Sequence, residues 1–356
     1  MKHTILLLFS SLLLFFACTK ELITPDPNPG PDPNCAEQNT IFAPDNKPAN
    51  VAGNIAFQGT IMGFQMINAD TGYLFGGNPN GFQAVLLKTT NGGKTFGPSN
   101  LQIHNQPVSF AFKDKDNGIV SVQDHTNLTI VSLTRDGGES WVSKTIPNLQ
   151  GSLNGLKFDE DGRLYAMLIS GTTAAIVVSE DEGDSWDTLF ASPDIDPFNV
   201  DFRFLVSGND LYVAGINKNI FVLNKQGSLQ RTISNPLGFG YAFQMPDEQN
   251  MIVVGYEGAY SSTNGGNSWK MLSDKPSRLL ACESPQKILT IQQKSNCNSD
   301  FVFSQDIIAR TTDGGANWQT ADLATTNLRF WHFGSQRIGP GKYLFIFGRQ
   351  LIAMNL

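Results

Sequence analysis

The octapeptide TTDGGANW, Thr311–Trp318, is the clearest indication of the fold of this 356-residue chain, because similar octapeptides occur four more times. The other copies are TTNGGKTF (Thr89–Phe96), TRDGGESW (Thr134–Trp141), SEDEGDSW (Ser179–Trp186) and STNGGNSW (Ser262–Trp269). Their central Asp or Asn residues are separated by 45, 45, 83 and 49 residues. Since 83 is close to two periods, we expect a degenerate copy, and Ile220–Ile233 has the same hydrophobic frame around a turn at Gln226 and Gly227.

These five octapeptides, called boxes below, have the composition of a hairpin turn. An Asp or Asn side chain accepts backbone N–H bonds, and the glycines after it adopt positive φ without a steric clash. The capping positions are Asn91, Asp136, Asp181, Asn264 and Asp313, and four boxes end in Trp141, Trp186, Trp269 and Trp318. Because Asn stands at two capping positions, a catalytic carboxylate is not the common requirement. We therefore predict structural turns with an aromatic plug.

A period in the forties made of short strands is typical of a β-propeller, in which each repeat forms one four-stranded blade. Five boxes and the degenerate copy account for six blades. Three further strands are expected at Leu328–Phe333, Lys342–Gly348 and Gln350–Leu356, and a strand within Asn39–Phe57 would complete them. We therefore predict an all-β, seven-bladed propeller over residues 39–356, closed by its N-terminal strand; six blades is the alternative.

The boxes resemble the BNR or Asp-box repeat, whose pattern is Ser/Thr-x-Asp-x-Gly-x-Thr-Trp. The family includes sialidases, xyloglucanases, sortilin-like receptors and photosystem II stability and assembly factor-like proteins. The stretches Gly72–Gly77 and Ile252–Trp269 are most similar to the last group, which implies a non-catalytic, protein-binding propeller. The repeat itself identifies a blade and no function.

The N-terminus has the pattern of an export signal. Lys2 precedes an apolar stretch, Ile5–Phe16, that is too short to span a membrane, and Ala17 precedes Cys18. We predict a signal peptide at 1–17 and lipidation of Cys18, followed by a Pro/Asp/Asn-rich tether over 18–38. The similarity to lipoproteins of Gram-negative bacteria favours the outer membrane, facing either side. An ordinary signal peptide is the alternative.

The formal net charge of −7 and the absence of a Lys/Arg cluster argue against binding to nucleic acid. Membrane association is expected through the lipid anchor only. No spacing of Cys and His residues fits a metal site, and no cofactor motif occurs, so neither a metal nor a cofactor is expected. Cys282 and Cys297 flank neighbouring predicted strands, and a disulfide between them is one possibility.

Two enzyme hypotheses were compared with the sequence. Sialidases resemble one another in holding the substrate carboxylate with three arginines, the first of them near the N-terminus, but the first arginine here is Arg135, inside a box. Another glycoside hydrolase would need two carboxylates across a cleft. The acidic clusters Asp159–Asp161 and Glu180–Asp184 both fall in predicted turns, where solvated side chains are the simpler interpretation.

A binding site in the central channel is the remaining hypothesis. Innermost strands are expected to carry Arg203, Arg278 and Arg329, with Tyr241 and Trp331 nearby. Guanidinium and aromatic groups suit an acidic peptide, a carboxylate or a sugar face, although packing and internal ion pairs would explain the same residues. The sequence therefore favours a non-catalytic binding or scaffold propeller for a protein or a surface glycan, with a glycoside hydrolase as the alternative.

Overall fold

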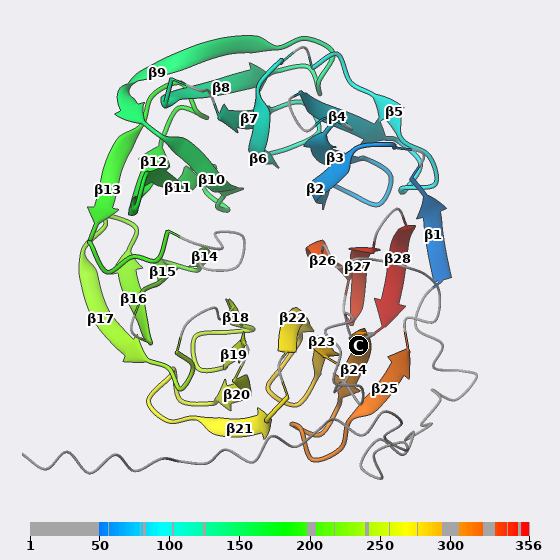
Figure 1. Ribbon diagram of the computed structural model, residues 1–356, viewed down its shortest axis with the longest axis vertical. Helices are drawn as coiled ribbons and strands as arrows, with labels where there is room; N and C mark the ends of the chain where they lie inside the picture. The colour runs from blue at the N-terminus through cyan, green and yellow to red at the C-terminus, as the bar shows by residue number, and fades with distance from the viewer. Residues whose placement is uncertain are drawn as a thin grey trace, which may run out of the picture.

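The computed structural model shows a ring of antiparallel sheets (Figure 1). It describes residues 50–355 except 56, 79, 81–82, 102, 124–125, 198–203, 217, 239–241, 256, 276, 294–305, 323–331, 340 and 348–349. These residues form seven four-stranded sheets, each radiating from the centre of the ring. The predicted all-β propeller is confirmed. In the described part of the chain, no helix has the length and apolarity required to cross a membrane.

The first three blades follow one another along the chain. Blade 1 contains β2 (Thr60–Met66), β3 (Gly72–Gly77), β4 (Ala84–Thr89) and β5 (Gly97–Pro98). Blade 2 contains β6 (Gln106–Phe112), β7 (Gly118–Gln123), β8 (Leu128–Thr134) and β9 (Val142–Gln150). Blade 3 contains β10 (Ser152–Phe158), β11 (Leu164–Ser170), β12 (Thr173–Ser179) and β13 (Asp187–Ala191). In each blade the first strand is innermost and the fourth lies at the rim.

The next three blades repeat this order. Blade 4 contains β14 (Phe204–Ser207), β15 (Asp210–Ala214), β16 (Asn219–Asn224) and β17 (Leu229–Ser234). Blade 5 contains β18 (Ala242–Gln244), β19 (Met251–Gly255), β20 (Gly258–Ser262) and β21 (Lys270–Ser273). Blade 6 contains β22 (Ser277–Cys282), β23 (Ile288–Gln293), β24 (Asp306–Thr311) and β25 (Gln319–Asp322). Blade 4 is the expected degenerate copy: Asn224 and Gly227 close a short turn through a 2.9 Å backbone bond.

Blade 7 joins the two ends of the chain. It contains β26 (His332–Gly339), β27 (Lys342–Phe347), β28 (Gln350–Asn355) and, as its outer strand, β1 (Asn50–Asn54). The N-terminal strand therefore pairs with the C-terminal one, as predicted. The expected first strand, Leu328–Phe333, overlaps β26 at His332 and Phe333, and its earlier residues lie outside the described part of the chain. A hairpin ending in Gly341 (φ 62°) follows β26.

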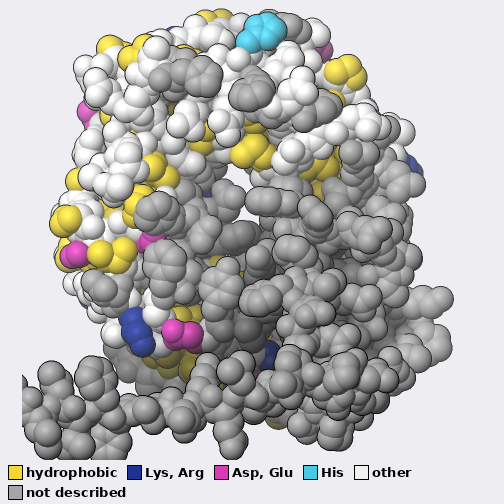
Figure 2. Space-filling model, viewed as in Figure 1, with side chains coloured by type: hydrophobic (Ala, Val, Ile, Leu, Met, Phe, Trp, Pro, Cys, Tyr) yellow, Lys and Arg dark blue, Asp and Glu magenta, His cyan; other side chains and the backbone are white. Residues whose placement is uncertain are grey.

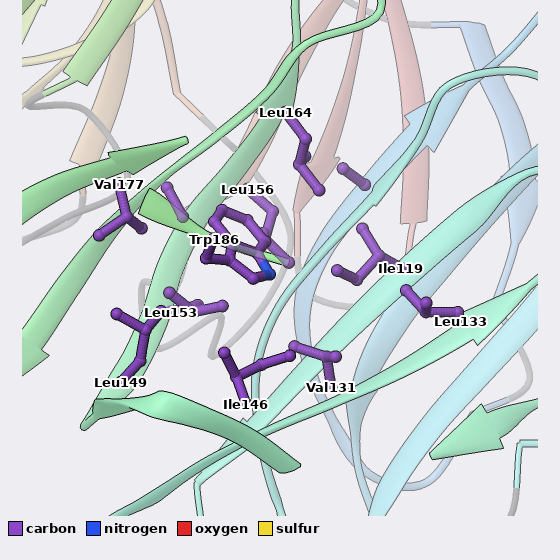
Figure 3. Close-up of a cluster of buried hydrophobic side chains, with 12 residues drawn as sticks. Ile119, Val131, Leu133, Ile146, Leu149, Leu153, Leu156, Leu164, Val177 and Trp186 are labelled. Atoms are coloured by element: carbon purple, nitrogen blue, oxygen red, sulfur yellow. The ribbon is translucent and has the colours of Figure 1, made fainter. Parts of the chain in front are cut away.

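The hydrophobic core lies between blades. Second strands of blades, such as β3, are buried along their whole length, because both faces of a blade pack against its neighbours. This burial explains the weak alternation of polar and apolar residues. The largest cluster places Trp186 among side chains of blades 2 and 3 (Figure 3). Its other members include Ile119, Val131 and Leu133 of blade 2 and Leu153, Leu156 and Val177 of blade 3.

Glutamines on two innermost strands join neighbouring blades at the channel. Gln65 Nε2 donates to the carbonyl of Phe112, and the Phe112 N–H donates to Gln65 Oε1, both at 2.8 Å. Gln336 of blade 7 binds the main chain of Met66 in the same two-bond manner. These bonds satisfy backbone groups on the inner edge of the following blade. An opening remains near the middle of the ring when side chains are drawn (Figure 2).

Candidate functional site at the blade hairpins

The structure places each box in the hairpin between the third and fourth strand of a blade. In blade 2, the Gly138 N–H donates to Thr134 Oγ1 and the Ser140 N–H donates to Asp136 Oδ1, both at 2.8 Å. The same two bonds recur in the other four boxes, at 2.7–3.0 Å. Asn91 and Asn264 perform this role as well as the aspartates do, because the turn requires only an acceptor oxygen.

The capping aspartates are held in their ionised form. Hydrogen bonds from the hydroxyl and N–H of Ser140, and from the Thr134 hydroxyl, lower the pKa of Asp136 from 3.8 to about 2. Backbone and side-chain bonds from Asn317 do the same for Asp313, again to about 2. A general acid requires the opposite shift, towards the working pH. These carboxylates therefore have the electrostatics of turn caps.

The tryptophans that end the boxes pack against the preceding blade. Trp269 Nε1 donates to the carbonyl of Ser234 at 2.9 Å, and Trp318 Nε1 donates to that of Leu272 at 3.2 Å. Trp186 is the most buried of the four, with 5% of its surface exposed. Each indole thus fills a joint between two blades, and the five boxes lie separately in blades 1, 2, 3, 5 and 6.

A second recurring turn was missed in the sequence. The hairpin between the first and second strand begins with a side chain that caps two following N–H groups, as Asn68 does for Asp70 and Thr71 at 2.9 and 2.8 Å. Asp114, Asp247 and Ser284 repeat it in blades 2, 5 and 6. The signal was an Asn, Asp or Ser shortly before the second strand of these four blades.

The two hairpins of a blade are joined on the same face of the ring. The N–H of the first box glycine donates to a carbonyl of the other hairpin, as in Gly137 to Asp116 at 2.8 Å. The equivalent bonds of blades 1, 5 and 6 are Gly92 to Asp70, Gly265 to Gln249 and Gly314 to Gln286, at 2.8–3.1 Å. The boxes and these turns therefore form one continuous surface.

Blade 3 departs from this pattern at Glu182. This residue stands where the other boxes have glycine, and its φ of 60° lies in the left-handed region, which costs a non-glycine residue about 1–2 kcal/mol. Among the described residues, no backbone bond joins Glu182 to the hairpin between β10 and β11. At Glu182 the backbone is strained, and the hydrogen bond that joins the two hairpins in other blades is missing. Backbone strain of this kind is often found at functional sites.

The surface at Glu182 is hollowed between blades 2 and 3. The depression has a volume of about 400 Å³. Its charged lining consists of Lys113, Arg135, Asp161, Arg163, Glu180, Asp181, Glu182 and Asp184. Lys113 Nζ lies 2.7 Å from Glu182, while Arg135 lies 3.4 Å from Glu182 and 3.6 Å from Asp184. We take this depression as the candidate site.

The channel residues singled out from the sequence are not brought together by the described structure. Arg203, Tyr241, Arg329 and Trp331 lie outside the described residues. Arg278 is part of β22, where it pairs with Ile291 in the backbone register, but its side chain lies outside the description. The channel hypothesis therefore remains a prediction.

The cysteines are only partly described. Cys18, Cys35 and Cys297 lie outside the described residues, so the predicted lipidation and disulfide remain predictions. Cys282 is a buried thiol at the end of β22, and its burial raises its pKa. Within the described ranges, no group of three or more His, Cys, Asp or Glu side chains is arranged to hold a metal ion.

The closed ring of seven sheets, with its recurring box hairpins, defines the chain as a β-propeller. Among solved structures it is similar to YCF48 bound to D1 peptide, with a TM-score of 0.62, 17% identity and coverage of 85% of this chain and 95% of the other. YCF48 from Cyanidioschyzon merolae gives a TM-score of 0.58 at 12% identity, covering 84% and 96%.

A second kind of propeller is equally similar in shape. A catalytically inactive virginiamycin B lyase from Staphylococcus aureus, with quinupristin, gives a TM-score of 0.60 at 13% identity, covering 85% of this chain and 97% of the lyase. No protein-family model and no curated protein matches the chain. At these identities the likeness concerns the fold alone, because one fold hosts many functions.

Proposed function

We propose that this chain is a non-catalytic propeller that binds a protein partner, with a surface glycan as the second class of ligand. One observation carries the proposal: the repeated carboxylates are turn caps with lowered pKa, Asp136 and Asp313 both at about 2. The side chains that recur in the five boxes build the ring, and this leaves its faces for recognition.

The structural comparison supports a protein as the ligand. A propeller of similar size and fold, YCF48, is described with a bound peptide. The lyase of the same shape is the reason to test turnover as well. The box face also offers a mixed-charge depression between blades 2 and 3, and partly polar, charged surfaces are typical of partner binding that is not obligate.

We further propose that the propeller is exported and anchored by lipid on Cys18, in the outer membrane of a Gram-negative bacterium. The signal-like segment 1–17 and the Pro-rich tether 18–38 support this location. The tether would lead into β1, which lies on the outer edge of blade 7. An anchor joined at the rim leaves both faces of the ring accessible.

The decisive experiment compares binding with turnover. The purified propeller, residues 39–356, is immobilised and exposed to solubilised envelope proteins and to a glycan array, and the same protein is assayed on chromogenic glycosides and sialosides. We expect a saturable protein ligand, competed by free propeller, and no hydrolysis. Steady hydrolysis that survives repurification would replace this proposal with the glycoside hydrolase alternative.

A further inference from the structure

The depression between blades 2 and 3 contains a guanidinium group that no described protein group hydrogen-bonds. A guanidinium has five N–H donors. Arg135 makes no hydrogen bond in the described structure, and its two carboxylate neighbours lie at 3.4 and 3.6 Å. Charge-assisted hydrogen bonds are about 2.7–2.9 Å long. With 44% of its side chain exposed, Arg135 remains open to a ligand.

The carboxylates around Arg135 are all engaged more closely by other groups. Glu182 lies 2.7 Å from Lys113, and Asp161 lies 2.6 Å from Lys225. Asp184 binds Lys144, Glu180 binds Arg163, and the Asp181 carboxylate caps its own box. The group left without a close partner is therefore a cation, although the depression as a whole is rich in acids.

From these contacts we propose that Arg135 binds the carboxylate of an Asp or Glu side chain presented by a protein partner. A bidentate carboxylate fits the planar fork of a guanidinium, which Lys does not reproduce. This inference rests on the proposed protein-binding function and names one contact of it. The volume of about 400 Å³ is sufficient for an acidic side chain.

Glu182 acts in this proposal as an internal competitor. At the corresponding joint between blades 4 and 5, Arg231 binds the carbonyl of the box glycine Gly265 at 2.8 Å. In blade 3 the box residue at that position is Glu182, whose carboxylate lies against Arg135 without forming a hydrogen bond. The carboxylate of the partner would displace Glu182 from Arg135, while Lys113 keeps Glu182 paired.

Gly162 provides the space in which Lys113 lies. A Cβ atom at Gly162, whose φ is +84°, would come within 2.8 Å of Lys113 Nζ. A side chain at this position would require the end of Lys113 to shift, so the hairpin of Gly162 forms one wall of the space in which Lys113 meets Glu182. The depression is formed jointly by both hairpins of blade 3 and by blade 2, so the contact would not recur at the other boxes.

The test uses a fluorescein-labelled hexaglutamate peptide and fluorescence anisotropy at low ionic strength. We expect saturable binding to the propeller, weakened about tenfold or more by Arg135→Ala, the loss expected for a hydrogen-bonded charge pair. Arg135→Lys should also weaken binding. Glu182→Gly, which removes the competitor and restores the glycine of the other boxes, should tighten it. Arg231→Ala, the matched guanidinium, should change nothing.

Three outcomes would overturn the inference: no binding of hexaglutamate, equal binding by Arg135→Ala, or tighter binding of hexalysine than of hexaglutamate. Unchanged thermal melting of each variant shows that the fold is retained. The proposed function is judged separately, since partner capture from envelope proteins that persists in Arg135→Ala would reject this site and leave the protein-binding function standing.

Discussion

Gln65 holds both main-chain groups of Phe112 in the next blade, through two hydrogen bonds of 2.8 Å. This bond pair lies at the inner edge of β6, where no further strand is available to satisfy the backbone. Gln336 repeats it between blades 7 and 1. The joints of the ring therefore combine buried apolar side chains with a small number of directed bonds.

Removing the Gln65 amide should weaken the joint between blades 1 and 2. Gln65→Ala leaves the N–H and carbonyl of Phe112 without their side-chain partner, and we expect a loss of about 1–3 kcal/mol in the free energy of unfolding. Urea denaturation measures it. Gln65→Glu serves as the control, because it can accept from the Phe112 N–H but cannot donate. A glutamate variant as stable as the wild type would show that the donated bond contributes nothing.

Trp186 should be the most costly of the box tryptophans to remove. It is 5% exposed in the largest interblade cluster, so Trp186→Ala is expected to lose about 3–5 kcal/mol of stability. Trp269, which is more exposed, provides the matched control, and its alanine variant should lose less. Thermal melting of the two variants side by side measures the difference. Equal losses would contradict the burial argument.

The box aspartates predict a specific pH dependence. The folded-state pKa of Asp136 is about 2, below its ordinary value of 3.8, so its contribution to stability is present above pH 3.8 and is lost as the pH falls towards 2. Asp136→Asn should keep the turn, as Asn91 and Asn264 do, and should reduce the loss of stability across that window. Urea midpoints measured at intervals through it compare the two proteins. Identical profiles would mean that Asp136 is not the titrating group.

Glu182→Gly should leave the protein as stable as before, or more stable. The substitution removes left-handed strain of about 1–2 kcal/mol, whereas the exposed ion pairs of Glu182 with Lys113 and Arg135 contribute about 0–1 kcal/mol. The gain should grow with added salt, which screens those pairs. Melting temperatures at low and high salt test this. A clear loss of stability at high salt would show that Glu182 has a structural role that its contacts do not explain.

Two truncated proteins distinguish the effect of removing the tether from the effect of removing β1. A chain beginning at residue 39 keeps β1 and should melt like the longer protein, whereas one beginning at residue 56 lacks Asn50–Asn54 and leaves β28 as an unpaired edge. We expect the shorter protein to melt at lower temperature and to associate, as measured by calorimetry and light scattering. Unchanged melting would mean that β1 does not close the ring.

The repeat allowed most of the fold to be predicted. Turn sequences are local, so the spacing of the boxes indicated the blades and the degenerate copy. The closure by an N-terminal strand was predicted from three C-terminal strands that lacked a fourth. For the first strand of blade 7, the apolar run Leu328–Phe333 indicated only the beginning of β26, because the strand continues through polar residues to Gly339.

The candidate site could not be predicted in the same way. The depression depends on Lys113, Arg135 and Glu182, which come from two blades and meet only in the folded ring. One signal was present in the sequence, because Glu182 replaces the first glycine of the third box. The sequence does not give the φ angle at this position, so the replacement looks like ordinary variation between repeats. The sequence directed attention to arginines on the first strands of blades, because those strands line the channel of a propeller.

The pairing of β1 with β28 sets the order in which the molecule is completed. Asn50–Asn54 pairs with Gln350–Asn355, the last strand that the structure describes, so a growing chain cannot close its ring before that strand is made. Contacts that far apart in sequence form slowly. Until then β1 lacks its partner strand, and the ring stays open.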